Sequence, residues 1–226
     1  MDSIHQAPIY SESGVDLTLL RENLRRPLAA RILQNASLVR FGQALRDSGK
    51  VPSAKEQPEK GNLMAEFDAP GLLRQLLKEK VDFVLIGGLA MIAQGSAYVT
   101  KDLDICYRRT PENIAAVAAS LAPIHPYLRG VPPGLPFQFD SPTIQAGLNF
   151  TLVTDLGDLD LLGEVRGIGF YDQVLAQSEE RDVLGMIIHV LTLDGLIAAK
   201  KAAARKKDQL HLLELEELKK LREGNP

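Results

Sequence analysis

The chain has 226 residues, 45% of them hydrophobic and 24% charged, and its formal net charge is −3. These values are ordinary for a globular protein and exclude a general attraction to nucleic acids or anionic membranes. A single cysteine, Cys106, excludes an intrachain disulfide framework. No apolar run approaches a membrane span, and residues 1–14 lack the basic and apolar regions of a signal peptide. We therefore predict a cytoplasmic protein with no membrane partner.

The first part of the chain predicts two helices followed by a linker. Apolar residues recur at helical spacing from Val15 to about Arg46, and Pro27 divides this stretch. Residues 47–62 are rich in charge, proline and glycine, which is typical of a linker. We predict that residues 1–62 form an N-terminal helical appendage and linker, which packs on the main domain or on a protein partner, and that residues 63–226 form the main domain.

The main domain begins with alternating helices and strands. A helix is predicted over residues 71–80, a strand over 83–86, a short helix over 89–94 and a strand over 103–107. Thr110 and Pro111 suit the N-cap and first position of a helix that ends near Leu121. Six prolines within residues 122–142 predict a long loop, and such loops are often functional.

The second half of the domain predicts a hairpin and then helices. Strand patterns over residues 148–153 and 159–162 flank a polar turn, and another strand is predicted over 187–190. Asp194 is expected to cap the next helix, and a last helix covers 210–221, so the C-terminal helical segment spans about 192–222. These elements predict an α+β protein with a small mixed sheet flanked by helices.

The most informative stretch runs from Phe83 to Asp104. An apolar strand ends at Gly87-Gly88, where a helix begins and backbone N–H groups have room to approach a phosphate. Asp102 and Asp104 follow at positions i and i+2 of the next strand, so both carboxylates point to one face. Adjacent carboxylates repel each other unless a cation lies between them, and oxygen ligands suit Mg²⁺. This combination predicts metal-assisted phosphoryl or nucleotidyl transfer.

A third carboxylate is predicted from a later strand. Asp160 stands between Leu159 and Leu161, where an isolated charge is costly unless it meets a partner or a metal. Asp158 shares its strand face and remains the alternative third carboxylate. An Asp-x-Asp pair alone is common by chance, so the prediction depends on its combination with the glycine pair and the third acidic strand.

Three motifs together resemble a known family. They are GG-x-A…G-x₄-T-x-D-L-D over residues 87–104, the strand that contains Asp160, and L-x-x-L-I-x-x-K-x-A-A-x-R-x-K-D over residues 193–208. This combination resembles the minimal nucleotidyltransferases of the polymerase-β-like superfamily, which include abortive-infection toxin–antitoxin nucleotidyltransferases. The resemblance covers roughly residues 65–222 and implies the polymerase-β-like nucleotidyltransferase fold.

The resemblance also implies roles for individual residues. Asp102 and Asp104 match the pair that binds Mg²⁺ (or Mn²⁺), and Asp160 matches the carboxylate that orients the attacking hydroxyl. The positions that match nucleotide-binding residues are Gly87, Gly88, Thr100, Lys200, Arg205 and Lys207, with Asp208 in the same C-terminal motif. Many relatives carry Ser at the second glycine and Arg at the position of Tyr98, so one expected cation is missing here.

The function that follows is transfer of a nucleoside monophosphate from an NTP to a hydroxyl, with release of pyrophosphate. The acceptor is predicted to be RNA such as a tRNA, a protein or a small molecule, in a toxin–antitoxin or defence system. One alternative is a non-catalytic antitoxin-like or regulatory binding module that keeps the fold. Another is a metal-dependent phosphohydrolase, because the Gly-Gly helix start also suits that chemistry.

Overall fold

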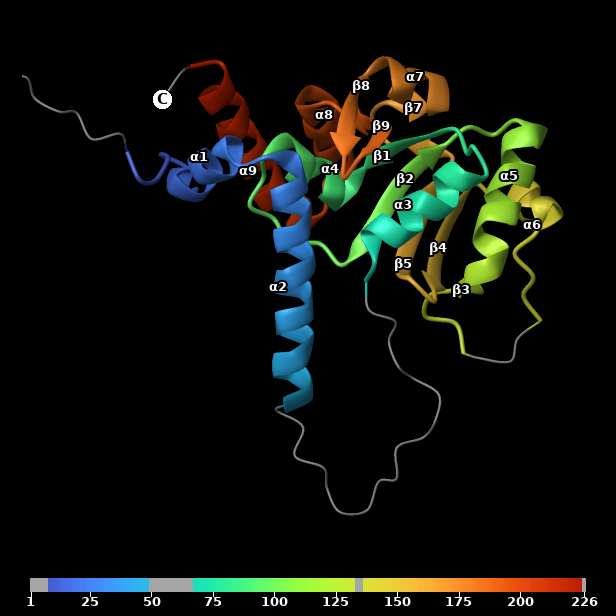
Figure 1. The fold of residues 1–226 in the computed structure, drawn as a ribbon. Coiled ribbons are helices and arrows are strands. Elements are labelled where there is room, and N and C mark those ends of the chain that lie inside the picture. Colours follow the sequence, from blue (N-terminus) through green and yellow to red (C-terminus); the bar gives the residue numbers. More distant parts are fainter. Residues whose placement is uncertain (1–7, 49–66, 133–135, 225–226) are drawn as a thin grey trace, which may run out of the picture.

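The computed structural model of this protein describes residues 8–48, 67–132 and 136–224, without the side chains of residues 45–48 and 207 (Figure 1). Within these ranges the protein is a mixed structure of helices around one large sheet. This architecture agrees with the predicted α+β class, whereas the sheet is larger than predicted.

The sheet has seven strands, whose order decides which residues become neighbours. In chain order they are β1 (Phe83–Ile86), β2 (Asp102–Tyr107), β3 (Tyr127–Leu128), β4 (Asn149–Thr154), β5 (Gly157–Leu162), β8 (Ser178–Val183) and β9 (Met186–Leu191). In space the order is β3-β4-β5-β2-β1-β9-β8. The central strand β2 is antiparallel to β1 and parallel to β5. Two further strands, β6 (Glu164–Val165) and β7 (Gly169–Phe170), form a separate ribbon.

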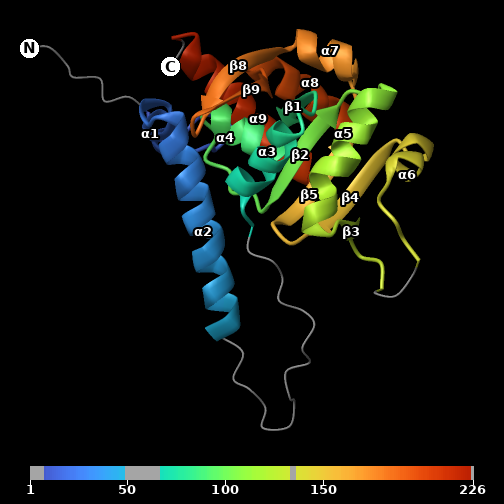
Figure 2. The same cartoon turned by 45° about the vertical axis from the view of Figure 1, so that its right-hand side comes forward.

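Helices cover the sheet and connect its strands. Figures 1 and 2 show α3 (Ala69–Lys78) and α5 (Pro111–Leu121) lying across one face of the sheet. The helix α4 (Gly87–Gln94) packs on β1, β2 and β9, and also on α8 (Leu193–Ala203), which in turn packs on α9 (Lys206–Arg222). Short helices complete the set: η1 (Ala122–Ile124), α6 (Ser141–Ala146) and α7 (Tyr171–Ala176). In the described ranges, no helix is long and apolar enough to cross a membrane.

The two N-terminal helices lie against the rest of the protein. They are α1 (Leu17–Arg25) and α2 (Leu28–Ser48), which confirms the predicted division at Pro27. α1 contacts α9, and α2 contacts α4 and β8. Leu17, Leu20 and Ile32 are buried in the common core, while Figures 1 and 2 show the second half of α2 extending away from the body. The predicted linker lies almost entirely outside the described residues, so the division at residue 62 stays a prediction, as does the protein partner.

Local signals predicted several elements correctly. The apolar run at residues 83–86 is β1, Thr110 accepts a hydrogen bond from Asn113 N as the N-cap of α5, and β4 pairs with β5 as a hairpin. The alternation of side chains in β2 and β5 then places an acidic row on one face of the sheet. The residues between these carboxylates and directly after them, Leu103, Ile105, Leu159 and Leu161, are fully buried.

Three predictions need correction. Residues 122–142 are not only a loop, because they contain η1 and β3 and the start of α6. Asp194 does not cap α8; Thr192 does, and its hydroxyl accepts a hydrogen bond from Gly195 N at 3.2 Å. The strand β8 was not predicted, because its sequence, SEERDV, carries the charged residues of an exposed sheet edge instead of an apolar run.

Because α1 contributes buried residues to the common core, we expect the N-terminal helices to unfold together with the sheet. Leu20 is 1% exposed, so Leu20→Ala should reduce the free energy of unfolding by about 2–5 kcal/mol. Leu33, in α2, is 54% exposed, so Leu33→Ala is the control and should change it by less than about 0.5 kcal/mol. We expect a single denaturant transition that shifts only in the first variant. A separate, earlier transition that alone responds to Leu20→Ala would mean that α1 and α2 fold independently.

Candidate functional site

The candidate site is built on the parallel pairing of β2 with β5. In this register Asp102 lies beside Asp158, and Asp104 lies beside Asp160. Asp102, Asp104 and Asp160 each offer one carboxylate oxygen, and these three atoms lie within 4.8 Å of one another. The structure thus brings together the three carboxylates that the sequence nominated, and Asp158 lies outside this group. An oxygen-only set of this kind suits a hard divalent cation.

The turn from β1 into α4 lies directly against this cluster. Gly87 has a φ of +63°, and a Cβ atom there would approach Oδ2 of Asp104 to 2.0 Å. Gly88 N donates a hydrogen bond to the same oxygen at 3.3 Å, and a Cβ atom on Gly88 would lie 2.6 Å from the Thr100 side chain. A larger residue would collide at either position, because Asp104 lies against Gly87 and Thr100 lies against Gly88. The Gly88 N–H, predicted to face a phosphate, is directed here at Asp104.

The charges of the cluster are only partly balanced. Burial, followed by the negative charges of Asp102 and Asp160, raises the pKa of Asp104 to about 7, and the Gly88 hydrogen bond only partly opposes these effects. Burial also raises the pKa of Asp160, against the opposing effect of Arg129. A carboxyl group whose ionised form is this unfavourable marks a place where a bound cation would be stabilising.

Arg129 is a part of the site that the sequence did not indicate. It follows β3, and its Nη2 donates to Oδ1 of Asp160 at 2.7 Å, while its Nε lies 3.3 Å from Oδ2 of Asp158. The same guanidinium donates to the carbonyl of Leu152 at 3.1 Å. Asp160, expected to need a partner or a metal, therefore has a cationic partner. The only available signal was a lone arginine in a proline-rich stretch.

Thr100 connects the glycine turn to the first carboxylate. Its side chain lies against Gly88, and its hydroxyl donates a hydrogen bond to Oδ1 of Asp102. Thr100 is 4% exposed, so in this structure it supports Asp102 from a buried position. Its predicted contact with a nucleotide stays a prediction.

The C-terminal cations meet at one buried carboxylate. Lys200 Nζ lies 3.1 Å from Oδ1 of Asp208, and Arg205 Nε lies 2.7 Å from Oδ2. Although burial raises the pKa of Asp208, the hydrogen bonds from Arg205 and Lys200 outweigh it and hold this pKa at about 2. Asp208 is therefore ionised at neutral pH and fixes both cations. The side chain of Lys207 lies outside the description.

A cavity of about 470 Å³ joins these parts. Its wall includes Gly87 and Asp104 from the carboxylate cluster, together with Lys200 of α8 and Arg205 at the start of α9. The glycine turn, one metal-binding candidate and two of the predicted phosphate-binding cations thus face a common space. Asn149 and Glu164 also line it. Glu164 follows Asp158 and Asp160 at even spacing in the sequence but belongs to β6, and no sequence signal indicated Asn149.

Comparison with protein-family models gives no match, and no curated protein matches the sequence significantly. The family resemblance therefore depends on the sequence motifs of this chain.

The raised pKa of Asp104 predicts a pH-dependent loss of stability in metal-free protein. Its folded pKa of about 7 lies above the ordinary value of 3.8, so between these values the folded protein holds a proton that the unfolded chain has released. The free energy of unfolding therefore falls as pH rises through this window. Asp104→Asn should raise the unfolding midpoint by several degrees at about pH 8 and leave it nearly unchanged at about pH 4.

Circular dichroism melts in the presence of a chelator measure this effect. The exposed Glu79→Gln variant removes one carboxylate elsewhere and should keep the pH dependence of the parent protein. An Asp104→Asn gain of equal size at both pH values would contradict the assignment.

Proposed function

We propose that this protein is a metal-dependent nucleotidyltransferase with a polymerase-β-like fold, which transfers a nucleoside monophosphate from an NTP to a hydroxyl group. The observation that carries the proposal is the convergence of Asp102, Asp104 and Asp160 within 4.8 Å, beside a glycine turn that opens a helix. The mixed sheet and the motif resemblance support the same assignment.

The donor set is suited to Mg²⁺ or Mn²⁺. All three donors are carboxylates, and the repulsion that raises the pKa of Asp104 would be relieved by a divalent cation. When bound, such a cation supplies charge neutralisation for the triphosphate and activation of the attacking oxygen. Asp102 and Asp104 are proposed to hold the ion that accompanies the nucleotide, and Asp160 to complete the set.

The nucleotide is proposed to enter the cavity between Asp104 and the C-terminal cations. Lys200 and Arg205 line that cavity and are fixed by Asp208, so their charges are available to the β- and γ-phosphates without a large rearrangement. Gly87 also lines this cavity and has no side chain that would keep a phosphate away from its backbone.

In the proposed reaction the acceptor oxygen attacks the α-phosphorus of the NTP. The bond from the α-phosphorus to the bridging oxygen breaks, and pyrophosphate leaves with the bond electrons. The carboxylate of Asp160 orients the acceptor hydroxyl and takes up its proton, which then passes to solvent. In-line geometry and charge neutralisation provide most of the rate enhancement in such transfers.

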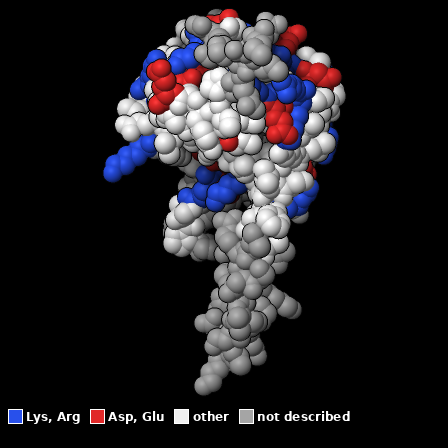
Figure 3. All heavy atoms as spheres, turned by 90° about the vertical axis from the view of Figure 1, so that its left-hand side faces the viewer, with Lys and Arg blue, Asp and Glu red and all other residues white. Residues whose placement is uncertain are grey.

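RNA, protein and small molecules are all candidate acceptors, in a toxin–antitoxin or defence setting. On the face in Figure 3, Lys and Arg side chains alternate with Asp and Glu around a broad uncharged area. Among its described residues, this face offers no continuous basic surface for an RNA backbone. The acceptor is best identified by transfer of label from each NTP, with Mg²⁺, into cell extract that is then separated into RNA, protein and small molecules.

The pairing of Arg129 with Asp160 favours a second candidate, a non-catalytic antitoxin-like or regulatory module. An arginine at 2.7 Å supplies the compensating charge that a metal would otherwise provide. In that case the acidic cluster would be a structural ion-pair network, and the protein would bind a partner without turning over NTP.

Substitution of the acidic residues separates the two candidates. Asp102→Asn, Asp104→Asn and Asp160→Asn should each lower pyrophosphate release by at least about a hundredfold, because each removes a metal ligand. Asp160→Asn should still bind NTP with Mg²⁺, since the other two carboxylates remain. Asp158→Asn is the matched control on the same strand and should lose little. Equal activity in all four variants would exclude the proposed site.

Arg129 provides an independent test by metal binding. If a cation uses Asp160, it competes with the guanidinium, so Arg129→Met should tighten Mn²⁺ binding roughly threefold to tenfold, as measured by calorimetry without nucleotide. Asp158→Asn also disturbs Arg129 but leaves the three ligands intact, so it should have a smaller effect. Absence of Mn²⁺ binding in both the parent and Arg129→Met would favour the non-catalytic module.

A further inference from the structure

We infer that Asn35, in the N-terminal helix α2, is a positioning residue for the carboxylate site and acts through Thr100. Its importance for turnover depends on the proposed function, whereas its effect on the geometry of β2 does not. The family resemblance covers only residues after about 65, so it assigns no role to this helix.

The buried side chain of Asn35 forms two hydrogen bonds with the backbone of Thr100. Asn35 is 4% exposed. Its Nδ2 donates to the carbonyl of Thr100 at 2.9 Å, and Thr100 N donates to its Oδ1 at 2.9 Å. One side-chain amide thus satisfies both backbone groups of a residue in a connecting segment, as a neighbouring strand would.

Thr100 transmits this constraint to the site. Its hydroxyl donates to Oδ1 of Asp102, and its side chain fills the space beside Gly88 where a Cβ atom would collide at 2.6 Å. A shift of the Thr100 backbone would therefore disturb a metal-binding candidate and the first turn of α4 together. Asn35 fixes the backbone on which both contacts depend.

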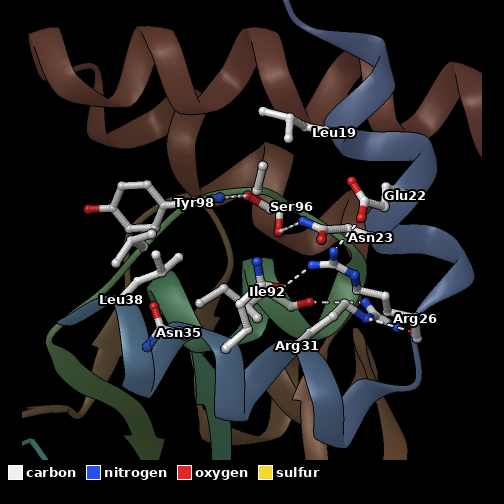
Figure 4. A pocket seen from close by; sticks show the side chains of 13 residues that line it. Leu19, Glu22, Asn23, Arg26, Arg31, Asn35, Leu38, Ile92, Ser96 and Tyr98 are labelled. Atoms are coloured by element: carbon white, nitrogen blue, oxygen red, sulfur yellow. Dashed lines mark hydrogen bonds and ion pairs between the residues drawn. The ribbon is translucent and has the colours of Figure 1, made fainter. Parts of the chain in front are cut away.

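Other polar contacts also connect the N-terminal helices with the segment after α4. Figure 4 shows α1 and α2 beside the segment after α4, with a pocket of about 220 Å³ between them. Polar contacts bridge this space: Asn23 Nδ2 donates to the carbonyl of Ser96 at 3.0 Å, and Arg31 donates to the carbonyls at the end of α4. From the other side, Glu214 of α9 accepts hydrogen bonds from Ser96 Oγ at 2.7 Å and from Ala97 N at 2.6 Å. Residues 96 and 97 are therefore held from two sides, whereas the hydrogen bonds described for the Thr100 backbone are those with Asn35.

Asn35→Ala would remove both partners of the Thr100 backbone from a buried place. The segment would move to find new partners, because an unpaired buried amide is costly. The Thr100 hydroxyl would then lose its alignment with Asp102. Substitutions that disturb residues behind metal ligands typically weaken metal binding tenfold to a hundredfold.

The experiment measures Mn²⁺ affinity of the full chain by calorimetry, without nucleotide. We expect Asn35→Ala to weaken binding about tenfold. Asn23→Ala is the matched control: the same residue type is removed, and the lost bond goes to Ser96 in the same segment. It should stay within about twofold of the parent. Equal weakening by both variants would mean a general loosening of the N-terminal helices and would overturn the inference.

A double-mutant cycle tests the route through Thr100. Thr100→Val removes the hydroxyl that contacts Asp102, so adding Asn35→Ala to it should change Mn²⁺ affinity by less than about twofold. Full additivity of the two effects would overturn the inference.

Hydrogen exchange of metal-free protein keeps the test independent of the proposed function. Asn35→Ala should accelerate exchange in residues 100–104 more than Asn23→Ala does, and equal rates would overturn the inference. If the parent protein fails to transfer nucleotide or to bind Mn²⁺, the proposed function fails, but this exchange difference still decides the role of Asn35.

Discussion

The parallel pairing of β2 with β5 is the constraint on which the site depends. It places Asp102 and Asp104 beside Asp158 and Asp160, so four like charges occupy two adjacent strands. The protein balances them from three directions, with the Gly88 N–H, the Thr100 hydroxyl and the Arg129 guanidinium. The balance is incomplete, because the pKa of Asp104, raised first by burial and then by its acidic neighbours, remains at about 7. A bound cation would stabilise the ionised form of Asp104, so this incomplete balance favours cation binding at the cluster.

Much of the fold was predictable because its signals are local. The apolar run of β1, the Thr110 cap and the β4–β5 hairpin depend on residues close in sequence. The choice of Asp160 over Asp158 for the cluster is different, since it depends on register with a strand more than fifty residues away. Sequence alternation gives the face of each carboxylate, but only the sheet order decides which carboxylates meet.

The parts of the site that escaped prediction share one physical cause. Arg129 belongs to a two-residue strand and its flank, and Asn35 to a helix separated from Thr100 by 65 positions. Both act through contacts between residues far apart in the sequence, Arg129 with Asp158 and Asp160 and Asn35 with the Thr100 backbone. Such contacts leave no periodicity in the sequence. β8 was missed because an exposed edge strand carries charges that look like a loop. The two residues that support the site, Arg129 and Asn35, therefore lie in segments whose local sequence pattern does not indicate a functional role.

The cations of the site fall into two classes with opposite consequences for ligands. Lys200 and Arg205 are held by Asp208, a buried carboxylate outside the metal-binding cluster. They stay fixed and charged, so they add positive potential to the cavity without occupying the carboxylates that a metal needs. Arg129 instead contacts Asp160 itself, so its charge stabilises the ionised carboxylate and, under the proposed function, would compete with a metal ion there. Under the proposed function, cationic side chains would thus favour phosphate on one side of the site and compete with the metal on the other.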